Sequence, residues 1–203
     1  MSRMGRIACL LMIVASFFTL GWADSFEGIQ AAAGKIHSLE ADFVQEKHMR
    51  ILAVPLIARG HLIFRSPDSL RWEYRHPMQS VLLMHGGISR RFIRSDQGWR
   101  EDAGAELNSM NFVFQEISNW LKGRFDENPL FTATLMPGNK IVLTPKGNGM
   151  DQFIQRVEMV MADEPGLMKE VLVFESADSF TRFSFVNPQL NQPLAETVFE
   201  KAQ

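Results

Sequence analysis

The stretch Gly-His-Leu-Ile-Phe-Arg-Ser-Pro-Asp-Ser-Leu-Arg-Trp-Glu-Tyr-Arg-His-Pro, residues 60–77, decides the fold class of this chain. It predicts two strands joined by a turn at Ser-Pro-Asp-Ser. Apolar and polar side chains alternate along both strands, so each strand has one apolar and one polar face. The apolar face holds Leu62, Phe64, Leu70, Trp72 and Tyr74. The pattern predicts a sheet whose apolar face meets either a packed core or an apolar ligand.

The first 23 residues have the features of a secretory signal peptide. Two arginines precede an apolar run over residues 7–20, and Gly21-Trp22-Ala23 places small residues where a signal peptidase reads. The run is short for a membrane span, although an uncleaved anchor is the alternative. We therefore expect cleavage after Ala23 and a single domain over residues 24–203.

Cysteine usage and charge narrow the class of protein further. The one cysteine, Cys9, lies within the apolar run, so the mature chain would hold none. Disulfides, thiolate catalysis and cysteine-bound metals are thereby excluded, and an exported protein of this kind fits a bacterial periplasm. The mature chain would carry 19 basic and 23 acidic residues, a net charge of −4. That balance argues against nucleic acid as a partner.

Beyond the opening stretch, the chain is mostly a succession of strands and turns. Roughly ten strands follow one another at hairpin spacing, from Leu39 to a last short segment around residues 197–199. Two segments have helical spacing instead, residues 25–37 and 106–125, and Gly123 is a plausible stop for the second. Consecutive hairpins predict an antiparallel, strongly curved sheet with helices on its concave side.

Few residues are spaced for catalysis or for metal binding. The five histidines show no compact ligand spacing, and the chain has no nucleophile elbow, phosphate loop or dinucleotide fingerprint. A triad of His61, Asp96 and a serine would require tertiary structure to assemble. We therefore expect a protein that is not an enzyme and that binds no metal and no cofactor. The arginines at positions 90, 91, 94 and 100 are expected to form a solvated face, or else a docking surface for a partner or for anionic lipid headgroups.

The chain is also rich in large apolar residues, with 16 Phe, 12 Met and 4 Trp. Methionine is flexible and polarizable, and surfaces that accept varied apolar shapes overuse it. An ordinary core with methionine as filler has the same composition. Composition therefore does not separate a filled core from a lipid cavity.

Four segments resemble the LolA family of periplasmic lipoprotein carriers. They are residues 39–45 with their Phe-x-Gln ending, residues 60–77, the Leu-Thr-Pro-Lys turn at 143–146, and residues 183–191 followed by Phe199. The resemblance spans essentially the whole mature chain. It implies a mainly β fold, an unclosed barrel of about eleven antiparallel strands with a helical lid over a concave hydrophobic cavity.

The resemblance also implies a function. Acyl chains of lipoproteins or related lipids would lie between barrel and lid, because each buried methylene stabilises the complex by about 0.8 kcal/mol. The expected partners are this cargo, an inner-membrane ABC transporter or other exporter, and an outer-membrane acceptor, with the carrier itself a monomer. The alternative is a periplasmic lipid-sensing or regulatory module on the same half-barrel, without a role in transport.

Individual lipid-binding residues follow from the same resemblance. Leu70 and Trp72 match the family's cavity-lining positions, and neighbouring residues share their face by alternation. The helix over residues 106–125 would be the lid. The expected lipid-binding set is Leu62, Phe64, Leu70, Trp72, Tyr74, Leu82, Met84, Met110, Phe114, Ile117 and Leu121.

One position departs from the family pattern. Classical carriers place an arginine immediately before the turn proline, where it holds the lid closed through hydrogen bonds to the lid backbone. Here that position is Ser66, and Arg65 comes one residue earlier. A shift of one residue along a strand points a side chain to the opposite face. We therefore expect a divergent paralogue, whose cargo is either a lipoprotein or another lipid such as a glycolipid.

Overall fold

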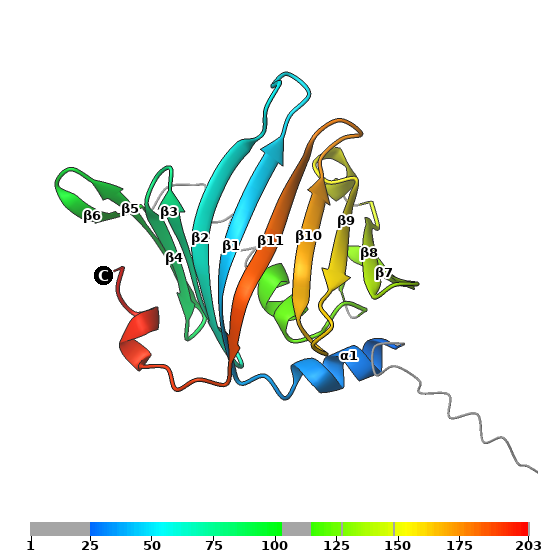
Figure 1. Cartoon of the computed structure of the whole chain (residues 1–203), viewed down its shortest axis with the longest axis horizontal. Coiled ribbons are helices and arrows are strands. Elements are labelled where there is room, and N and C mark those ends of the chain that lie inside the picture. Colours follow the sequence, from blue (N-terminus) through cyan, green and yellow to red (C-terminus); the bar gives the residue numbers. More distant parts are fainter. Residues whose placement is uncertain (1–24, 103–114, 127, 148, 203) are drawn as a thin grey trace, which may run out of the picture.

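The computed structural model describes residues 25–102, 115–126, 128–147 and 149–202. Within these residues, eleven strands form one antiparallel sheet that is not closed, with two helical segments (Figure 1), which confirms the predicted fold class. The expected signal peptide and the expected lid residues 106–114 lie outside the described residues.

The elements have the following bounds. The strands are β1 (Ser38–His48), β2 (Leu56–Arg65), β3 (Ser69–His76), β4 (Ser80–His85), β5 (Ile88–Ser95), β6 (Gly98–Glu101), β7 (Phe131–Met136), β8 (Lys140–Pro145), β9 (Arg156–Met161), β10 (Met168–Phe174) and β11 (Phe180–Leu190). The helical elements are α1 (Phe26–Ala33), residues 115–121, and the 3-10 turns η1 (Met150–Gln152) and η2 (Glu196–Phe199).

The first and last strands pair in the middle of the sheet. The strand order is β6-β5-β4-β3-β2-β1-β11-β10-β9-β8-β7, so hairpins spread from the central β1–β11 pair to both sides. Because neighbours are antiparallel, the β1–β2, β3–β4 and β10–β11 turns lie at one end of the sheet, the upper end in Figure 1. Helix α1 lies at the opposite end.

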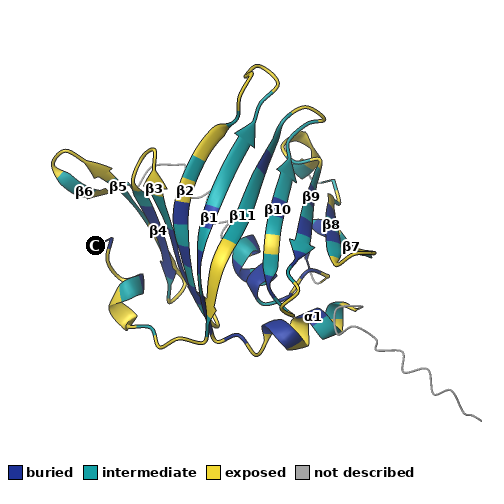
Figure 2. Cartoon of the chain, viewed as in Figure 1, coloured by how far each residue is buried: buried dark blue, intermediate teal, exposed yellow. Residues whose placement is uncertain are grey.

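The predicted alternation of residues 60–77 is present, and its apolar face is the concave one. Leu62, Phe64 and Leu70 are at most 1% exposed, and Trp72 is 4% exposed. Leu121, from the helical segment 115–121, packs in the same apolar cluster. Figure 2 shows that the buried residues of β1, β2 and β3 lie toward the end of the sheet where α1 lies. The helix ends at residue 121, and Gly123 follows with a φ of +71°, as expected of a helix stop.

Gly60 gives Phe43 room to lie across the sheet. The two residues are paired on β1 and β2. A Cβ atom at position 60 would overlap both the Phe43 ring and the backbone oxygen of Glu73. The ring therefore occupies the space that a side chain at position 60 would take. This contact explains why the stretch that opens the β2–β3 hairpin begins with glycine.

The C-terminal segment differs from the prediction. The expected last strand around residues 197–199 is the 3-10 turn η2. The strand before it, β11, already has β1 and β10 as neighbours, so it offers no free edge for another strand. The segment instead crosses to the outer face of β3 and β4, where the Phe199 side chain is 2% exposed.

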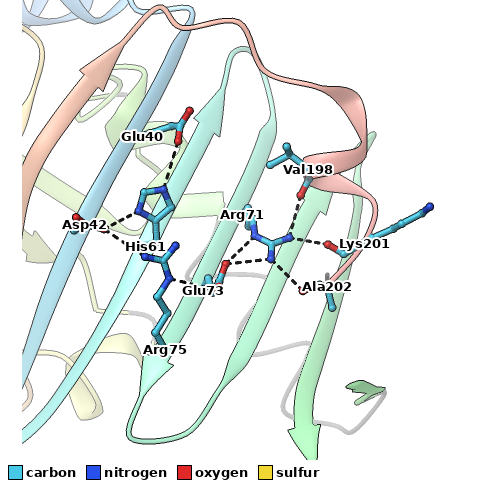
Figure 3. Close-up of polar contacts among 9 residues, drawn as sticks. All are labelled: Glu40, Asp42, His61, Arg71, Glu73, Arg75, Val198, Lys201 and Ala202. Carbon is cyan, nitrogen blue, oxygen red and sulfur yellow. Dashed lines mark hydrogen bonds and ion pairs between the residues drawn. The ribbon is translucent and has the colours of Figure 1, made fainter. Parts of the chain in front are cut away.

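Arg71 holds this segment on the outer face. Its guanidinium donates hydrogen bonds to the backbone oxygens of Val198, Lys201 and Ala202, at 3.2, 2.6 and 3.1 Å. A further bond goes to Glu73, and the arginine is only 7% exposed. Figure 3 shows Arg71 at the centre of these contacts. Three carbonyl groups, of which that of Ala202 is buried, thus depend on one side chain.

A second polar group lies beside it on β1, β2 and β3. His61 Nδ1 lies 2.8 Å from Asp42, and Nε2 lies 3.5 Å from Glu40 (Figure 3). The pKa of Asp42 is lowered, chiefly because of its hydrogen bond with His61. Arg75 lies near Asp42 and Glu73, at 3.7 and 3.5 Å, and is half exposed.

Replacement of Gly60 by alanine is expected to destabilise the protein by about 2 kcal/mol or more, because the new methyl group overlaps the Phe43 ring and a backbone oxygen. Urea unfolding followed by circular dichroism measures the change. An unchanged midpoint would contradict the role assigned to this contact.

Arg71→Ala is expected to cost about 2–3 kcal/mol, because it removes a buried charged donor and leaves three carbonyls of the C-terminal segment, one of them buried, without it. Arg75→Ala is the matched control on the same face of β3, and should cost less than about 1 kcal/mol because its ion pairs are exposed. Thermal melting compares the two variants. Equal losses would show that Arg71 has no special role.

Candidate functional site: an apolar interior beneath residues 115–121

Four aromatic rings form the middle of the concave face. The Trp72 ring lies 4.5 Å from Phe43, and meets Phe183 and Phe185 edge to face at 5.6 and 6.3 Å. The rings come from β1, β3 and β11, which are not consecutive in sequence but are brought together by the central pairing of the sheet. Edge-to-face contacts of this kind are favourable beyond the apolar area that they bury.

Tyr74 continues this aromatic group toward the upper end. Its hydroxyl donates a 2.6 Å hydrogen bond to Gln45 Oε1, and its ring lies 5.3 Å from Phe43. Burial raises the pKa of Tyr74, so the phenol stays protonated and keeps donating. The Phe-x-Gln ending of the first strand thus has a structural meaning: Phe43 supplies the ring and Gln45 accepts the tyrosine proton.

A cavity of about 130 Å³ lies between the sheet and residues 115–121. Of the described residues that line it, Glu116 is the one that is ionisable, and the other side chains are apolar. The lining consists of Trp72, Glu116, Ile117, Trp120, Phe131, Ile154, Val157, Met168, Val171, Val173, Phe183 and Phe185.

A second cavity, of about 160 Å³, lies toward the α1 end of the same face. Met168 and Phe185 line both cavities. A dry cavity of roughly 150 Å³ holds a benzene-sized group, whereas ligand pockets typically measure about 300–1,000 Å³. A long acyl chain therefore needs both spaces joined, and the flexible Met168 side chain lies where they meet.

The structure divides the expected lipid-binding residues by whether they line a cavity. Trp72 and Ile117 line the first cavity, and Leu62 and Leu121 line the second. Tyr74 is partly buried against the core. Another group is packed in the core without lining either cavity: Phe64, Leu70, Leu82 and Met84. Met110 and Phe114 lie outside the described residues.

Most of the first cavity's lining was not expected from the sequence. Val157, Val171 and Val173 on β9 and β10, with Phe183 and Phe185 on β11, form one continuous part of the wall. Alternation along those strands was a readable signal, because Val171 and Val173 share one face, as do Phe183 and Phe185. The signal gives the face of a strand and leaves open whether that face is filled.

Glu116 connects the helical segment to the sheet. It is 6% exposed, and Asn128 Nδ2 donates a hydrogen bond to its carboxyl group. Asn128 Oδ1 in turn accepts from the backbone N–H groups of Leu130 and Phe131, where β7 begins. Burial raises the pKa of Glu116, and the bond from Asn128 only partly offsets that effect. A carboxyl group that is more easily kept neutral is thus enclosed in the cavity wall.

A serine, a histidine and a carboxylate meet on the outer face rather than in the cavity. Ser69 Oγ lies 2.8 Å from His85 Nδ1, and His85 Nε2 lies 2.9 Å from Glu196. Ser69 is 2% exposed, and the Phe199 ring stacks on His85 at 6.0 Å. Because the hydroxyl is enclosed, a substrate has no access to it, and the group serves to hold η2 in place. His61 and Asp96 do not form the triad considered above, since His61 lies between Glu40 and Asp42.

Arg65 also binds the C-terminal segment. It donates two hydrogen bonds to Glu196, at 2.8 and 3.0 Å, and its guanidinium lies 4.8 Å from the centre of the Phe199 ring. The side chain is thus on the outer face, as the one-residue shift predicts. It fastens η2 instead of the helical segment over the concave face.

The positive charges of the arginines on β5 and β6 are largely balanced by nearby acidic or aromatic side chains. Arg90 makes two 2.8 Å bonds to Glu101, Arg91 lies 3.3 Å from Asp102, and Arg94 lies over the Trp99 ring. A solvated face accounts for these contacts. Across the residues that the structure describes, there is no group of three or more side chains suited to a metal ion and no helix long and apolar enough to cross a membrane.

The fold and site define a class of protein: an open antiparallel half-barrel with an apolar interior partly covered by a helical segment. Comparisons of the sequence with known proteins are consistent with this class. The family model described as "Outer membrane lipoprotein carrier protein LolA" matches residues 34–91. An outer-membrane lipoprotein carrier protein of Proteus mirabilis is 25% identical over 129 residues, which cover 62% of this chain and 60% of that protein, less than two thirds of its length.

A second carrier, from Photorhabdus laumondii, is 21% identical over 173 residues, which cover 83% of this chain and 79% of the relative. Among solved structures, a LolA superfamily protein from Nitrosomonas europaea aligns over 87% of this chain and 98% of its own, with 9% identity and a TM-score of 0.43. That last likeness is too weak to say anything about function. The chain thus resembles the LolA carriers, with a family match over residues 34–91 and identities of 25% and 21% to the two relatives.

Glu116→Gln is expected to remove a pH dependence of stability. Because burial raises the pKa of Glu116 in the folded state, its stabilising contribution is complete below the unfolded pKa and is lost as the pH rises through the folded pKa. Glutamine stays neutral and can still accept from Asn128. The variant should therefore melt higher than the wild type above neutral pH, with the difference shrinking toward pH 4. Parallel curves over the whole pH range would contradict the buried placement of this carboxyl group.

Proposed function

We propose that the chain is a periplasmic carrier that binds the acyl chains of lipoproteins or related lipids and moves them from the inner to the outer membrane. The apolar cavity beneath residues 115–121 is the observation that supports this function most directly. The LolA-like matches support the same class of cargo, since both relatives are named as lipoprotein carriers. On this proposal, the protein is loaded by an inner-membrane ABC transporter or other exporter and unloaded at an outer-membrane acceptor.

The physical requirement is to keep hydrocarbon out of water between two membranes. Each methylene that leaves water contributes about 0.8 kcal/mol, so an acyl chain is held by area and needs no specific polar bond. The cavity lining fits that mode, because its side chains are apolar apart from Glu116. Release then requires the wall to open rather than a strong bond to break.

Residues 115–121 are the part of the wall suited to open. They rest on the sheet through Ile117, Trp120 and Leu121, and are tied to β7 by the contact of Glu116 with Asn128. Among the residues that the structure describes, the buried Ser118 hydroxyl and Trp120 Nε1 find no hydrogen-bond partner. Such groups make closure less stable than a fully satisfied interface would be, which favours a wall that opens readily.

A transfer assay tests the function. Purified protein is loaded with a radiolabelled acylated lipoprotein from donor inner-membrane vesicles, then mixed with outer-membrane vesicles. We expect the label to appear in the soluble complex and then in the acceptor. Uptake of lipid without delivery would support the lipid-sensing or regulatory alternative instead, and failure of both steps would refute the carrier proposal.

Filling the cavity should block uptake without unfolding the protein. Val173 lines the cavity and is only partly buried, so Val173→Phe places a ring in the space that an acyl chain needs. Leu172→Phe is the matched control, because the neighbouring residue on β10 faces the other side of the sheet. We expect the affinity for a fluorescent fatty acid to fall at least about tenfold in the first variant and to change little in the second.

Circular dichroism and thermal melting confirm that both variants fold. Equal affinity in the two variants would show that the acyl chain does not occupy this cavity.

A further inference from the structure

The turn between β1 and β2 carries an exposed apolar surface that the interior of the protein does not use. Residues 49–59 read Met-Arg-Ile-Leu-Ala-Val-Pro-Leu-Ile-Ala-Arg. Ile51 is 82% exposed, Val54 72%, Leu56 56% and Ile57 50%. We call residues 49–57 the hairpin tip. Figure 2 shows it as an exposed loop that projects beyond the upper end of the sheet.

The register of the sheet explains why the tip projects. On β2, Leu56, Ile57 and Ala58 pair with β1, whereas pairing with β3 begins only at Arg59 and His76. Leu56 and Ile57 point to opposite faces of the strand and are nevertheless both exposed. Neither face of this part of the hairpin is therefore covered by the fold. Clustered apolar side chains that a fold leaves exposed mark sites of interaction.

The charge on the hairpin tip itself is positive and would attract anionic groups. From Lys47 to Pro67 the chain contains no acidic residue. Arg50 and Arg59 flank the exposed apolar residues, and both are exposed. The adjacent β10–β11 turn brings Glu175, which is paired with Lys47 at 3.2 Å, and Asp178. The apolar segment itself thus carries only positive charge.

We propose that the hairpin tip is a membrane-docking surface that enters the headgroup region of a bilayer containing anionic phospholipid. Aliphatic side chains on a projecting loop gain apolar contact in that region, while flanking arginines bind lipid phosphates with their long side chains. A protein interface would instead call for a groove or flat patch with aromatic residues and a polar rim. The hairpin tip is a projecting loop, and residues 49–57 include no aromatic residue. This inference goes beyond the proposed carriage of lipid, because docking at the tip does not require an occupied cavity.

Vesicle co-sedimentation tests the proposal with the purified protein. The two probes are vesicles of phosphatidylcholine with phosphatidylglycerol, and vesicles of phosphatidylcholine alone. We expect the wild type to bind the mixed vesicles, and Ile51→Asn/Val54→Asn to bind them at least about tenfold more weakly. Both replaced side chains are exposed, so the fold should be unaffected. Arg50→Gln should weaken binding to the mixed vesicles and leave binding to phosphatidylcholine unchanged.

The matched control is Ile88→Asn/Met136→Asn, which removes two exposed apolar side chains at the opposite end of the sheet. It should bind vesicles as the wild type does. Equal loss in the two double variants, or no binding of the wild type to either vesicle, would overturn the proposal. So would a tip that is required only for binding a membrane protein, with protein-free vesicles left unbound.

Fatty-acid uptake in solution separates this proposal from the proposed function. The Ile51→Asn/Val54→Asn variant should take up a fluorescent fatty acid like the wild type, because the tip does not line the cavities. Vesicle binding without any uptake would refute the carrier proposal and leave the docking surface standing. Uptake without vesicle binding would refute the docking surface and leave the carrier proposal standing.

Discussion

The Phe43 ring lies over Gly60 at the centre of the sheet, and the remaining aromatic contacts are built on it. The ring brings Trp72 and Tyr74 of β3 into contact with Phe183 of β11 across the central strand pair. The two halves of the sheet, formed by strands from opposite ends of the chain, therefore share one aromatic floor. The cavities lie on one side of this floor, under the helical segment 115–121.

The same floor explains why the concave face is divided. On the β2–β4 side, Phe64, Leu70, Leu82 and Met84 pack as an ordinary core and line neither cavity. On the β9–β11 side, valines meet the ring edges, and their smaller volume leaves the first cavity open. A half-filled interior suits a carrier, because the filled half maintains the fold while the other half changes with its cargo. The outer-face contacts of Arg65 and Arg71 fix the C-terminal segment without using the concave face.

Much of the fold could be predicted from local patterns. Alternation along residues 60–77 gave the hairpin and its buried face, and hairpin spacing gave an antiparallel sheet. The four-residue strand β6 is too short to show an alternating pattern, and the residues of η2 favour a strand locally. What decides η2 is the absence of a free edge at β11 and the donor groups of Arg71, which are tertiary facts.

The site could be predicted only in part, for a similar reason. Trp72 and Ile117, two of the expected lipid-binding residues, line the first cavity, but alternation cannot tell a filled face from a hollow one. The buried Glu116 carried no sequence signal, because its partner Asn128 is twelve residues away on a different element. The lipid-binding role of the whole set remains a prediction.

The most direct test of the central claim is an unbiased mass-spectrometric profile of lipid bound to the protein purified from its own envelope compartment. The account predicts acylated lipid or lipoprotein in near-stoichiometric amount, retained by the wild type and depleted in Val173→Phe. A protein that emerges free of acyl lipid, and that takes up none when fatty acid is added, would contradict it.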